Sequence, residues 1–179
     1  MQGLLAASLL ELLDKQPIQK ISAREIAANC GLSTRTFYNY YRDKNELVSQ
    51  IYCDMSESAW YTNGKLNTLG EYLSAWIYHA HTDYLNFFIN TFAYRGQNNL
   101  RETIHKKGVA DLIRLIQANG HWDAVTQDAE RSLSVYMYGL IGYFEETVLT
   151  SPQNADLKIW SEHQAQECLP KSIYDALIG

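Results

Sequence analysis

Residues 22–47 read SAREIAANCGLSTRTFYNYYRDKNEL, and this stretch predicts two short helices joined by a tight turn. Ser22 is a suitable N-cap for the first helix, and Glu25, three residues later, can complete a capping box. Gly31 tolerates the left-handed backbone that ends many helices, so the first helix should stop there. Ser33 can then cap a second helix from residue 34 to about residue 40.

The second helix has two chemically different faces. Phe37 and Tyr41 are four residues apart, so they share a face and can pack inward together with Leu32. Short polar donors and an arginine on a helix suit base edges and phosphates in the major groove. The other face carries such residues, namely Thr34, Arg35, Tyr38 and Asn39. Cap, turn and periodicity agree, which favours a DNA-binding helix-turn-helix over a hairpin whose tyrosines only pack.

The motif G-L-S-x-x-T-F-Y-x-Y-Y-x-x-K-x-E-L within this stretch resembles the signature of the TetR family of bacterial transcription regulators. The resemblance extends over residues 4–47. It implies an all-α protein, with a three-helix DNA-binding head at residues 1–47 on a helical ligand-binding and dimerisation body at residues 48–179. It also implies base or groove contacts from Thr34, Arg35, Thr36 and Asn39, and phosphate contacts from Tyr38, Tyr40 and Lys44.

Two features depart from the family pattern. Tyr41 stands where the family usually has Phe, so its hydroxyl must reach the edge of the small core of the head. Many members carry a basic arm before the first helix, whereas this chain has no basic side chain before Lys15. Anchoring by such an arm is therefore not expected.

The formal net charge is −5, but it is unevenly distributed along the chain. Residues 1–47 carry six basic and five acidic side chains, so the excess of negative charge lies in the body. Only charges within roughly one Debye length, about 8 Å, of the DNA phosphates contribute appreciably to the attraction between protein and DNA. We therefore expect few phosphate contacts and a shallow salt dependence of DNA binding.

The three cysteines are widely spaced and form no C-x-x-C pair, which argues against a zinc or redox motif and fits a reducing cytosol. No charged segment of the signal-peptide type precedes the first apolar residues. The longest apolar run, residues 133–144, is too short to span a membrane. We expect a soluble, cytoplasmic protein.

Few prolines and glycines interrupt the chain, so it reads as helices throughout. The first helix should cover residues 3–15, and a helix from 44 towards 61, capped by Asp43, should join head to body. The polar break at residues 81–83 predicts two helices within 68–94. Further helices are expected at 98–119, 126–150 and 155–169, followed by a short tail at 171–178.

The body is rich in Tyr and Trp, whose polar atoms need partners when they are buried. Family resemblance implies a ligand pocket among the helices of the body for an unidentified small molecule. Aromatic residues at helical spacing can equally fill a core. The expected lining consists of Trp76, His79, Tyr84, Phe88, Tyr136 and Tyr143.

The histidines of the body raise the possibility of a metal site. Glu102 and His105 have the spacing used in di-iron bundles, and His79, His81 and Asp83 lie close in sequence. A di-iron site needs two Glu-x-x-His motifs, and this chain has one. No nucleophile with a base and no Gly-rich phosphate loop is apparent. We predict no metal, no cofactor, no catalytic residues and no enzymatic activity.

The apolar helix at 126–150 is the expected dimer element, because Gly139 and Gly142 would allow close helix approach. An operator-reading helix-turn-helix of this size needs two half-sites for useful affinity. The alternative is that the same stripe faces its own core. The expected interface consists of Leu133, Met137, Leu140, Ile141 and Phe144.

The sequence thus predicts a homodimeric, ligand-responsive regulator, more often a repressor in this family, that binds a pseudo-palindromic DNA operator and no membrane. Two alternatives stay open. One is a ligand-independent regulator controlled by a protein partner, with its pocket filled by the same aromatic residues. The other is a helical-bundle metalloenzyme that has borrowed the head fold.

Overall fold

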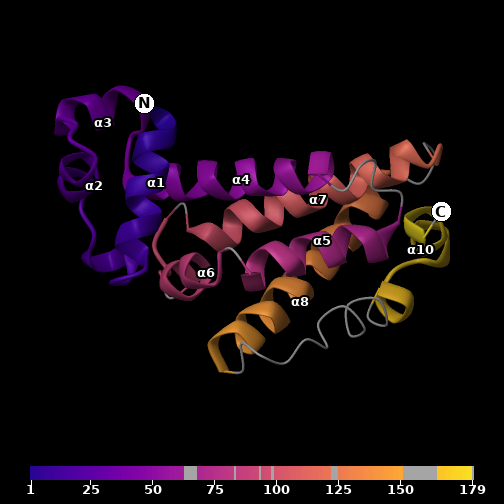
Figure 1. The fold of residues 1–179 in the computed structure, drawn as a ribbon. Coiled ribbons are helices and arrows are strands. Elements are labelled where there is room, and N and C mark those ends of the chain that lie inside the picture. The colour runs from indigo at the N-terminus through magenta and orange to yellow at the C-terminus, as the bar shows by residue number, and fades with distance from the viewer. Residues whose placement is uncertain are drawn as a thin grey trace.

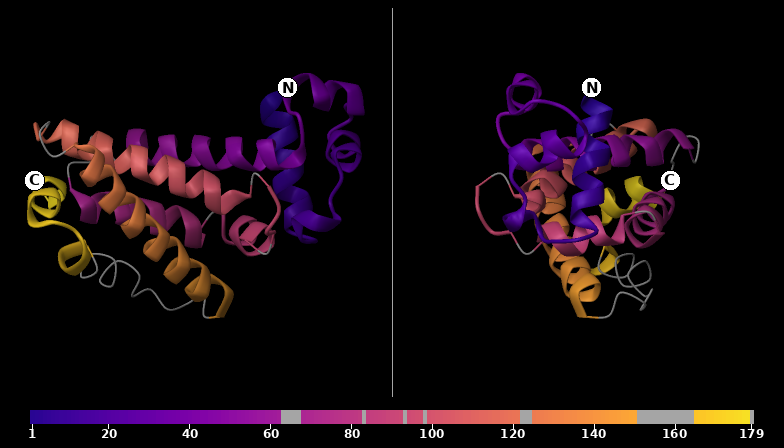
Figure 2. Two further views of the ribbon diagram at one scale, coloured as in Figure 1. Left: turned by 180° about the vertical axis from the view of Figure 1, so that it is seen from behind. Right: turned by 60° about the vertical axis from the view of Figure 1, so that its left-hand side comes forward.

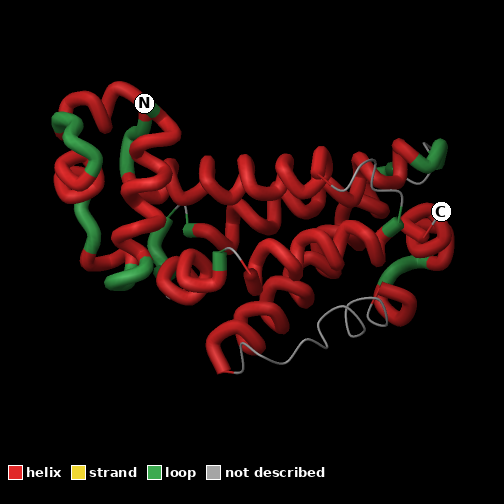
Figure 3. Tube along the Cα trace, in the orientation of Figure 1, coloured by secondary structure: helices red, strands yellow, loops and turns green. Residues whose placement is uncertain are grey.

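A computed structural model describes residues 1–62, 68–82, 84–92, 94–97, 99–121, 125–150 and 165–178, without the side chains of residues 59–62, 77–82 and 147–150. Over this part of the chain Figure 3 shows helices and loops and no strand. The all-α prediction is confirmed.

The head consists of three short helices and a single 3-10 turn. These elements are α1 (Gln2–Leu13), the 3-10 turn Ile18–Lys20, α2 (Ala23–Asn29) and α3 (Thr34–Tyr40). Helix α1 ends two residues earlier than expected, because Asp14 already caps it and Pro17 starts the 3-10 turn. Helix α3 has the bounds that the sequence predicts.

The local signals of the helix-turn-helix are realised in the hydrogen bonds. Ser22 Oγ accepts from the Glu25 backbone N–H over 3.2 Å, and Glu25 Oε2 accepts from the Ser22 backbone N–H over 2.7 Å. This reciprocal pair is the capping box. Gly31 has φ +71°, in the left-handed region, and Ser33 Oγ accepts from the Thr36 N–H over 3.0 Å. Cap and turn residues therefore fix the angle between α2 and α3.

The body continues from the head without a linker. Its helices are α4 (Lys44–Thr62), α5 (Leu69–Thr82), α6 (Leu85–Phe92), α7 (Leu100–Ala118), α8 (Gln127–Thr150) and α10 (Lys171–Ile178). The break between α5 and α6 confirms the split predicted at residues 81–83. Residues 171–178 form a helix, not the short tail expected from the sequence. Most of the helix predicted at 155–169 lies outside the described residues, and the domain boundary at residue 47 stays an expectation.

The helices of the body form a bundle with the head at one end (Figure 1). Helix α4 leaves the head and runs alongside α7, and α8 crosses beneath them; the reversed view in Figure 2 shows the same arrangement. The α10 helix lies at the end far from the head. Because α4 belongs to both parts, a tilt of α4 in the body also moves the head.

Helices α7 and α8 pack closely at a glycine of α7. Gly108 of α7 lies against Met137 of α8, and a Cβ at Gly108 would clash with that side chain. By contrast, a Cβ at Gly139 or Gly142 would meet nothing within 4 Å. The glycine that brings α7 and α8 together is therefore on α7, and the two glycines of α8 face away from this contact.

Candidate functional site

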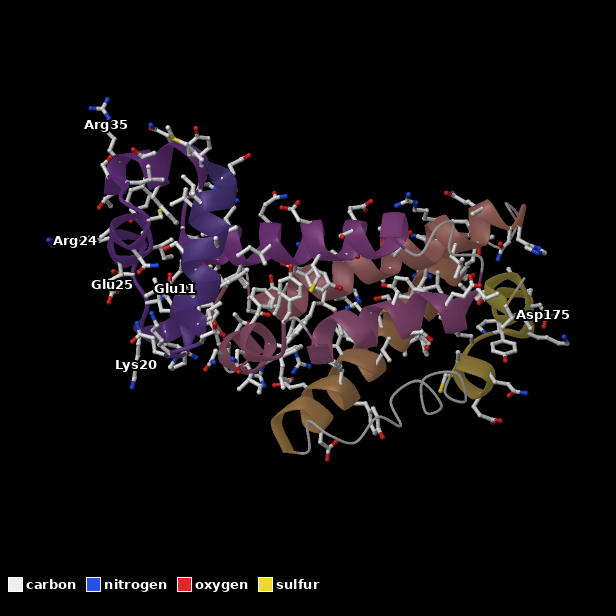
Figure 4. All side chains as sticks on the ribbon, in the orientation of Figure 1. Glu11, Lys20, Arg24, Glu25, Arg35 and Asp175 are labelled. Atoms are coloured by element: carbon white, nitrogen blue, oxygen red, sulfur yellow. The ribbon has the colours of Figure 1, made fainter. Side chains whose placement is uncertain are left out.

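The outer face of α3 is open to solvent. Arg35, Tyr38, Asn39 and Tyr40 are exposed, and Thr34 and Thr36 are partly exposed. Figure 4 shows Arg35 pointing away from the tip of the head. The Thr36 hydroxyl lies 2.9 Å from Ser33 Oγ, so it shares a hydrogen bond at the start of the helix. The structure thus brings these six predicted DNA-contact residues together on one short helix.

The inner face of α3 holds the helix in place. Phe37 and Tyr41 are buried, and their ring centroids lie 5.8 Å apart. Burial raises the pKa of the Tyr41 phenol, and the carboxylates of Asp54 and Glu46 raise it further. Tyr41 therefore stays neutral and acts as a packing residue, even though Phe is usual at this position in the family that the motif resembles.

Lys44 has a structural environment that sequence reasoning did not anticipate. Its Nζ donates to the backbone carbonyls of Ile18 and Ile21, each over 2.6 Å, and to that of Gln19 over 3.4 Å. An ammonium group has three N–H donors, so these carbonyls account for all of them. Burial lowers the pKa of Lys44, and Glu25 and Asp43 oppose that shift. Lys44 ties the start of α4 to the 3-10 turn of the head, which weakens the case for a direct phosphate contact.

Two further cations of the head are exposed outside the recognition helix, and sequence reasoning did not single them out. Lys20, at the end of the 3-10 turn, and Arg24, on α2, are exposed and point outward along the head in Figure 4. Neither belongs to the recognition helix, so the motif gave no reason to single them out. The only feature of the sequence that could have indicated these two residues is a positive charge within or next to residues 22–47.

Helix α6 of the body is joined to the first helix of the head by side-chain amides. Asn90 Nδ2 donates to the Leu13 carbonyl over 2.7 Å, at the end of α1. Asn86 Nδ2 donates to Asp14 Oδ1 over 2.9 Å. The first of these bonds satisfies a backbone carbonyl at the end of a helix, where no intrahelical donor is available, and both bonds attach α1 to the body.

A partly buried ionic network joins α4 to α7. Lys107 donates to Glu57 over 2.7 Å and also to Asp111, which in turn accepts from Ser56 Oγ over 3.0 Å. Arg114 donates to Glu57 over 3.2 Å. Burial raises the pKa of Asp111, while its hydrogen bond to Lys107 opposes the rise. The network fixes the register of the helix that carries the head.

The predicted ligand pocket coincides with packed aromatic rings. Trp76 lies 4.3 Å from Phe144 and 6.5 Å from Phe88, between ring centroids, and Phe88 lies 5.3 Å from Phe144. Tyr136 is buried, and Tyr84 and Tyr143 are partly buried against the same core. His79 has a side chain outside the described part. The structure therefore brings Trp76 and Phe88 together as a packed cluster.

A cavity of about 270 Å³ lies elsewhere among the described residues, where the start of α7 meets α8. The residues predicted for the ligand pocket do not line it. Its walls include Arg95, Arg101, His105, Lys106 and Tyr138. Of these, only His105 had drawn attention in the sequence, as half of a metal motif.

The predicted dimer stripe faces the interior of its own chain. The five side chains assigned to it are buried: Leu133, Met137, Leu140, Ile141 and Phe144. Because a side chain packed in the core contacts a second copy only after rearrangement, this burial favours the alternative that the stripe faces its own core, and the interface itself stays a prediction. The exposed side of α8 instead carries Val135, 70% exposed, and Tyr138, 60% exposed, together with Gly139.

The histidine of the suspected metal motif is engaged in other contacts. His105 Nε2 lies 2.9 Å from Ser134 Oγ, and its ring stacks on that of Tyr138, with centroids 3.9 Å apart. Within the described part of the chain, no three His, Cys, Asp or Glu residues are grouped as metal ligands would be. His79, His81 and Asp83 lie outside the described side chains. None of the described helices is long and apolar enough to cross a membrane.

Comparisons with known proteins agree with this geometry. Residues 4–51 match a family model described as "Bacterial regulatory proteins, tetR family". No curated protein matches the chain at a significant level. A solved structure described as "Dihydroxyacetone kinase operon activator DhaS" superposes with a TM-score of 0.64, at 16% identity, over 93% of each chain. At that identity the likeness shows a shared fold.

Proposed function

Because residues 4–51 match the model of the tetR family of bacterial regulatory proteins, we propose that the chain is a transcriptional regulator of this kind, which binds a pseudo-palindromic operator as a homodimer. The observation that carries this proposal is the outward face of α3, where Arg35, Tyr38, Asn39 and Tyr40 are exposed together on a helix capped and packed from behind. Such a helix fits the major groove of B-DNA. A protein that binds the chromosome would act in the cytoplasm.

In this proposal Arg35 and Asn39, with Thr34 and Thr36, contact base edges. Arg pairs well with guanine, and Asn pairs well with adenine. Tyr38 and Tyr40 contact phosphates through their hydroxyls. Lys20 and Arg24 join them as exposed cations of the head, in place of Lys44, whose ammonium is bound within the head.

The second copy would bind on the exposed side of α8. Val135 is a large hydrophobic side chain in solvent, and the open space beside Gly139 and Gly142 leaves room for a partner helix. Tyr138, on the same side of α8, stacks on His105 of α7, so the second copy would lie beside its ring and beside the cavity that the ring lines. The stripe 135, 138, 139, 142 has the spacing of one helix face. Two heads joined through this face would read two half-sites about one or more helical turns apart.

Regulation in this proposal is a shift of population between two head separations. A ligand that favours the conformer with the wrong separation lowers operator affinity by its differential affinity for the two states. The ionic network between α4 and α7 and the amides between α6 and α1 are the contacts that would change. Repression is the expected outcome at the promoter.

A regulator controlled by a protein partner is the second candidate. The packing of Trp76 against Phe144 and of Phe88 against Phe144 favours it, because these rings fill the space in which the sequence predicts a ligand pocket. A small-molecule response then requires another cavity in the body.

The test begins with purified protein and a pool of random double-stranded DNA. Repeated selection and sequencing should give an inverted repeat, and light scattering of the complex should give two chains for each site. Arg35→Ala should abolish enrichment of that site, whereas Lys171→Ala, which removes an exposed charge at the far end of the body, should not. Enrichment of no sequence by the folded wild-type protein would contradict the proposal.

A further inference from the structure

The cavity where the start of α7 meets α8 has a charged wall and an apolar wall. Arg95, Arg101 and Lys106 contribute cations from the loop before α7 and from its first two turns. Tyr138 and Ile141 contribute carbon surface from α8. Small-molecule sites commonly combine apolar lining with a few convergent polar groups.

The two arginines are held in place by one buried carboxylate. Arg95 and Arg101 each donate to a different oxygen of Glu145, whose side chain is only 8% exposed. Arg95 also donates to the Phe92 carbonyl over 2.8 Å. Their side chains are nevertheless 57% and 33% exposed, so each guanidinium has a face toward solvent. Because an arginine has five N–H donors, both can still bind an anion without giving up Glu145.

The charge balance indicates how many negative charges the cavity accommodates. Arg95, Arg101 and Lys106 face Glu102 in the wall and Glu145 behind it, so the cavity has one excess positive charge when His105 is neutral. Helix α7 begins at this cavity, and the partial positive charge of its N-terminus has the same sign. A singly charged anion therefore balances the site, whereas a doubly charged phosphate monoester would exceed it.

The apolar wall and the volume limit the rest of the ligand. The Tyr138 ring stacks on His105 at an interplanar angle of 22°, which fixes a flat surface beside the cations. A cavity of about 270 Å³ is slightly below the usual range of ligand pockets, about 300–1,000 Å³. The ligand should therefore be a compact molecule, planar or short-chained, with its anionic group at one end.

We propose that this cavity is the effector site, and that it binds a small monocarboxylic acid. The carboxylate lies between Arg95, Arg101 and Lys106, and the apolar part lies on Tyr138 and Ile141. The proposal that it is an effector site rests on the proposed function as a DNA-binding regulator. The proposal that it is a binding site does not.

The position of the cavity explains how occupancy would reach the head. Glu102 and Lys106 also line a second hollow, of about 250 Å³, together with Arg42, just before α4, and with Glu46 and Ser49 near the start of α4. Beside it, Ser49 Oγ and Thr103 Oγ1 lie 2.7 Å apart, linking α4 to α7. A carboxylate that attracts Lys106 into the first cavity changes the charge facing α4, directly after the recognition helix.

The binding test uses calorimetry without DNA, with benzoate as probe and benzyl alcohol as its uncharged counterpart. Wild-type protein should bind benzoate saturably at millimolar concentrations or below and should not bind benzyl alcohol. Lys106→Gln should weaken benzoate binding about tenfold, the expected scale for losing one charge-assisted contact. Lys106 is exposed and has no ion pair within the described part, so its replacement leaves the core intact. Arg95→Gln, at the more exposed arginine, should weaken it likewise.

Two control variants locate the bound anion. Lys171→Gln removes an exposed charge on α10 and should leave benzoate binding unchanged. Arg35→Ala removes a cation from the DNA-binding face and should also leave it unchanged. Loss of binding in Arg35→Ala with retention in Lys106→Gln would place the anion on the head and overturn the proposal. Absence of saturable benzoate binding to the folded wild type, or tighter binding of inorganic phosphate, would overturn it as well.

The regulatory part is tested with the selected operator. If benzoate changes operator affinity by some factor, operator DNA must change benzoate affinity by the same factor. If benzoate binds but leaves operator affinity unchanged, the proposed effector role is overturned, whereas the proposed binding of a carboxylate in the cavity still holds. Failure of the wild type to bind any operator would instead overturn the proposed function. The calorimetry would still show whether the cavity binds benzoate.

Discussion

The indole Nε1 of Trp76 donates a hydrogen bond to the phenol oxygen of Tyr52 over 3.1 Å, in the interior between α5 and α4. Both side chains are buried, and burial raises the pKa of Tyr52 far above its ordinary value. The polar atom of each residue thus has its partner inside the protein. This pair explains how an aromatic core rich in Trp and Tyr can be filled without a ligand.

We therefore expect Trp76→Ala to behave as a core substitution. It should lower the free energy of unfolding by roughly 3–5 kcal/mol, because it removes a large buried ring and leaves a cavity. Tyr52→Phe should cost less, roughly 1–3 kcal/mol, since it leaves the indole N–H unpaired. Denaturant unfolding measures both. A stable Trp76→Ala protein that had lost only its response to an effector would restore Trp76 to a ligand pocket.

Lys44→Met should destabilise the head. Removing the donor to the carbonyls of Ile18 and Ile21 should lower the free energy of unfolding by roughly 1–3 kcal/mol. The dependence of operator affinity on salt should keep its slope, whereas loss of a phosphate contact would reduce that slope by about one. Lys20→Met is the matched control, because the Lys20 side chain is exposed. It should leave the free energy of unfolding unchanged and should reduce the slope of the salt dependence.

Arg35→Ala and Asn39→Ala should each weaken binding to the selected operator by roughly 1–3 kcal/mol and relax the preference at one base position. The reason is that both side chains are exposed on the outer face of α3. Competition binding with single-base variants of the operator measures the effect. An unchanged base preference in Arg35→Ala would exclude Arg35 from direct base recognition.

Val135→Arg should give a folded monomer that has lost most of its operator affinity. Val135 is exposed on the single chain, so a charge there harms only a contact with a second copy. Leu140→Arg places the same charge in the core and should unfold the protein instead. Light scattering and circular dichroism distinguish the two. A Val135→Arg variant that remained dimeric would move the interface away from this side of α8.

The contribution of Glu57 to stability should depend on pH. Its hydrogen bond with Lys107 lowers the pKa of Glu57 below its ordinary 4.5, so the ionised form is favoured in the folded state. That stability is fully present above pH 4.5 and is lost as the pH falls through the lower folded value. Wild type and Glu57→Gln should thus differ in free energy of unfolding at neutral pH and converge in acid. If the difference in free energy of unfolding between wild type and Glu57→Gln stayed constant from neutral to acid pH, the stabilising role of ionised Glu57 would be contradicted.

The helix-turn-helix was predictable because its signals are local. The capping box of Ser22 and Glu25, the left-handed Gly31 and the cap at Ser33 each act within a few residues, and each is present in the structure. The two faces of α3 follow from the same helical period. Local chemistry therefore determined the DNA-binding helix and most helix boundaries of the chain.

Which face of α8 is buried was decided only by tertiary structure. The sequence showed the apolar stripe through Leu133 and Leu140, but periodicity does not tell whether a stripe meets its own chain or a second copy. Gly108, on another helix, determines how closely α7 and α8 approach.

The same holds for the contacts that join distant parts of the chain. Lys44 reaches carbonyls more than twenty residues away, and Glu145 gathers Arg95 and Arg101 from a different helix and loop. Nothing local to any of these residues specifies its partner. Hydrogen bonds and ion pairs between segments far apart in sequence form only once packing has placed the helices. The sequence by itself therefore determined the DNA-binding motif, whose signals are local. The tertiary structure decided the cavity and the contacts that support the head.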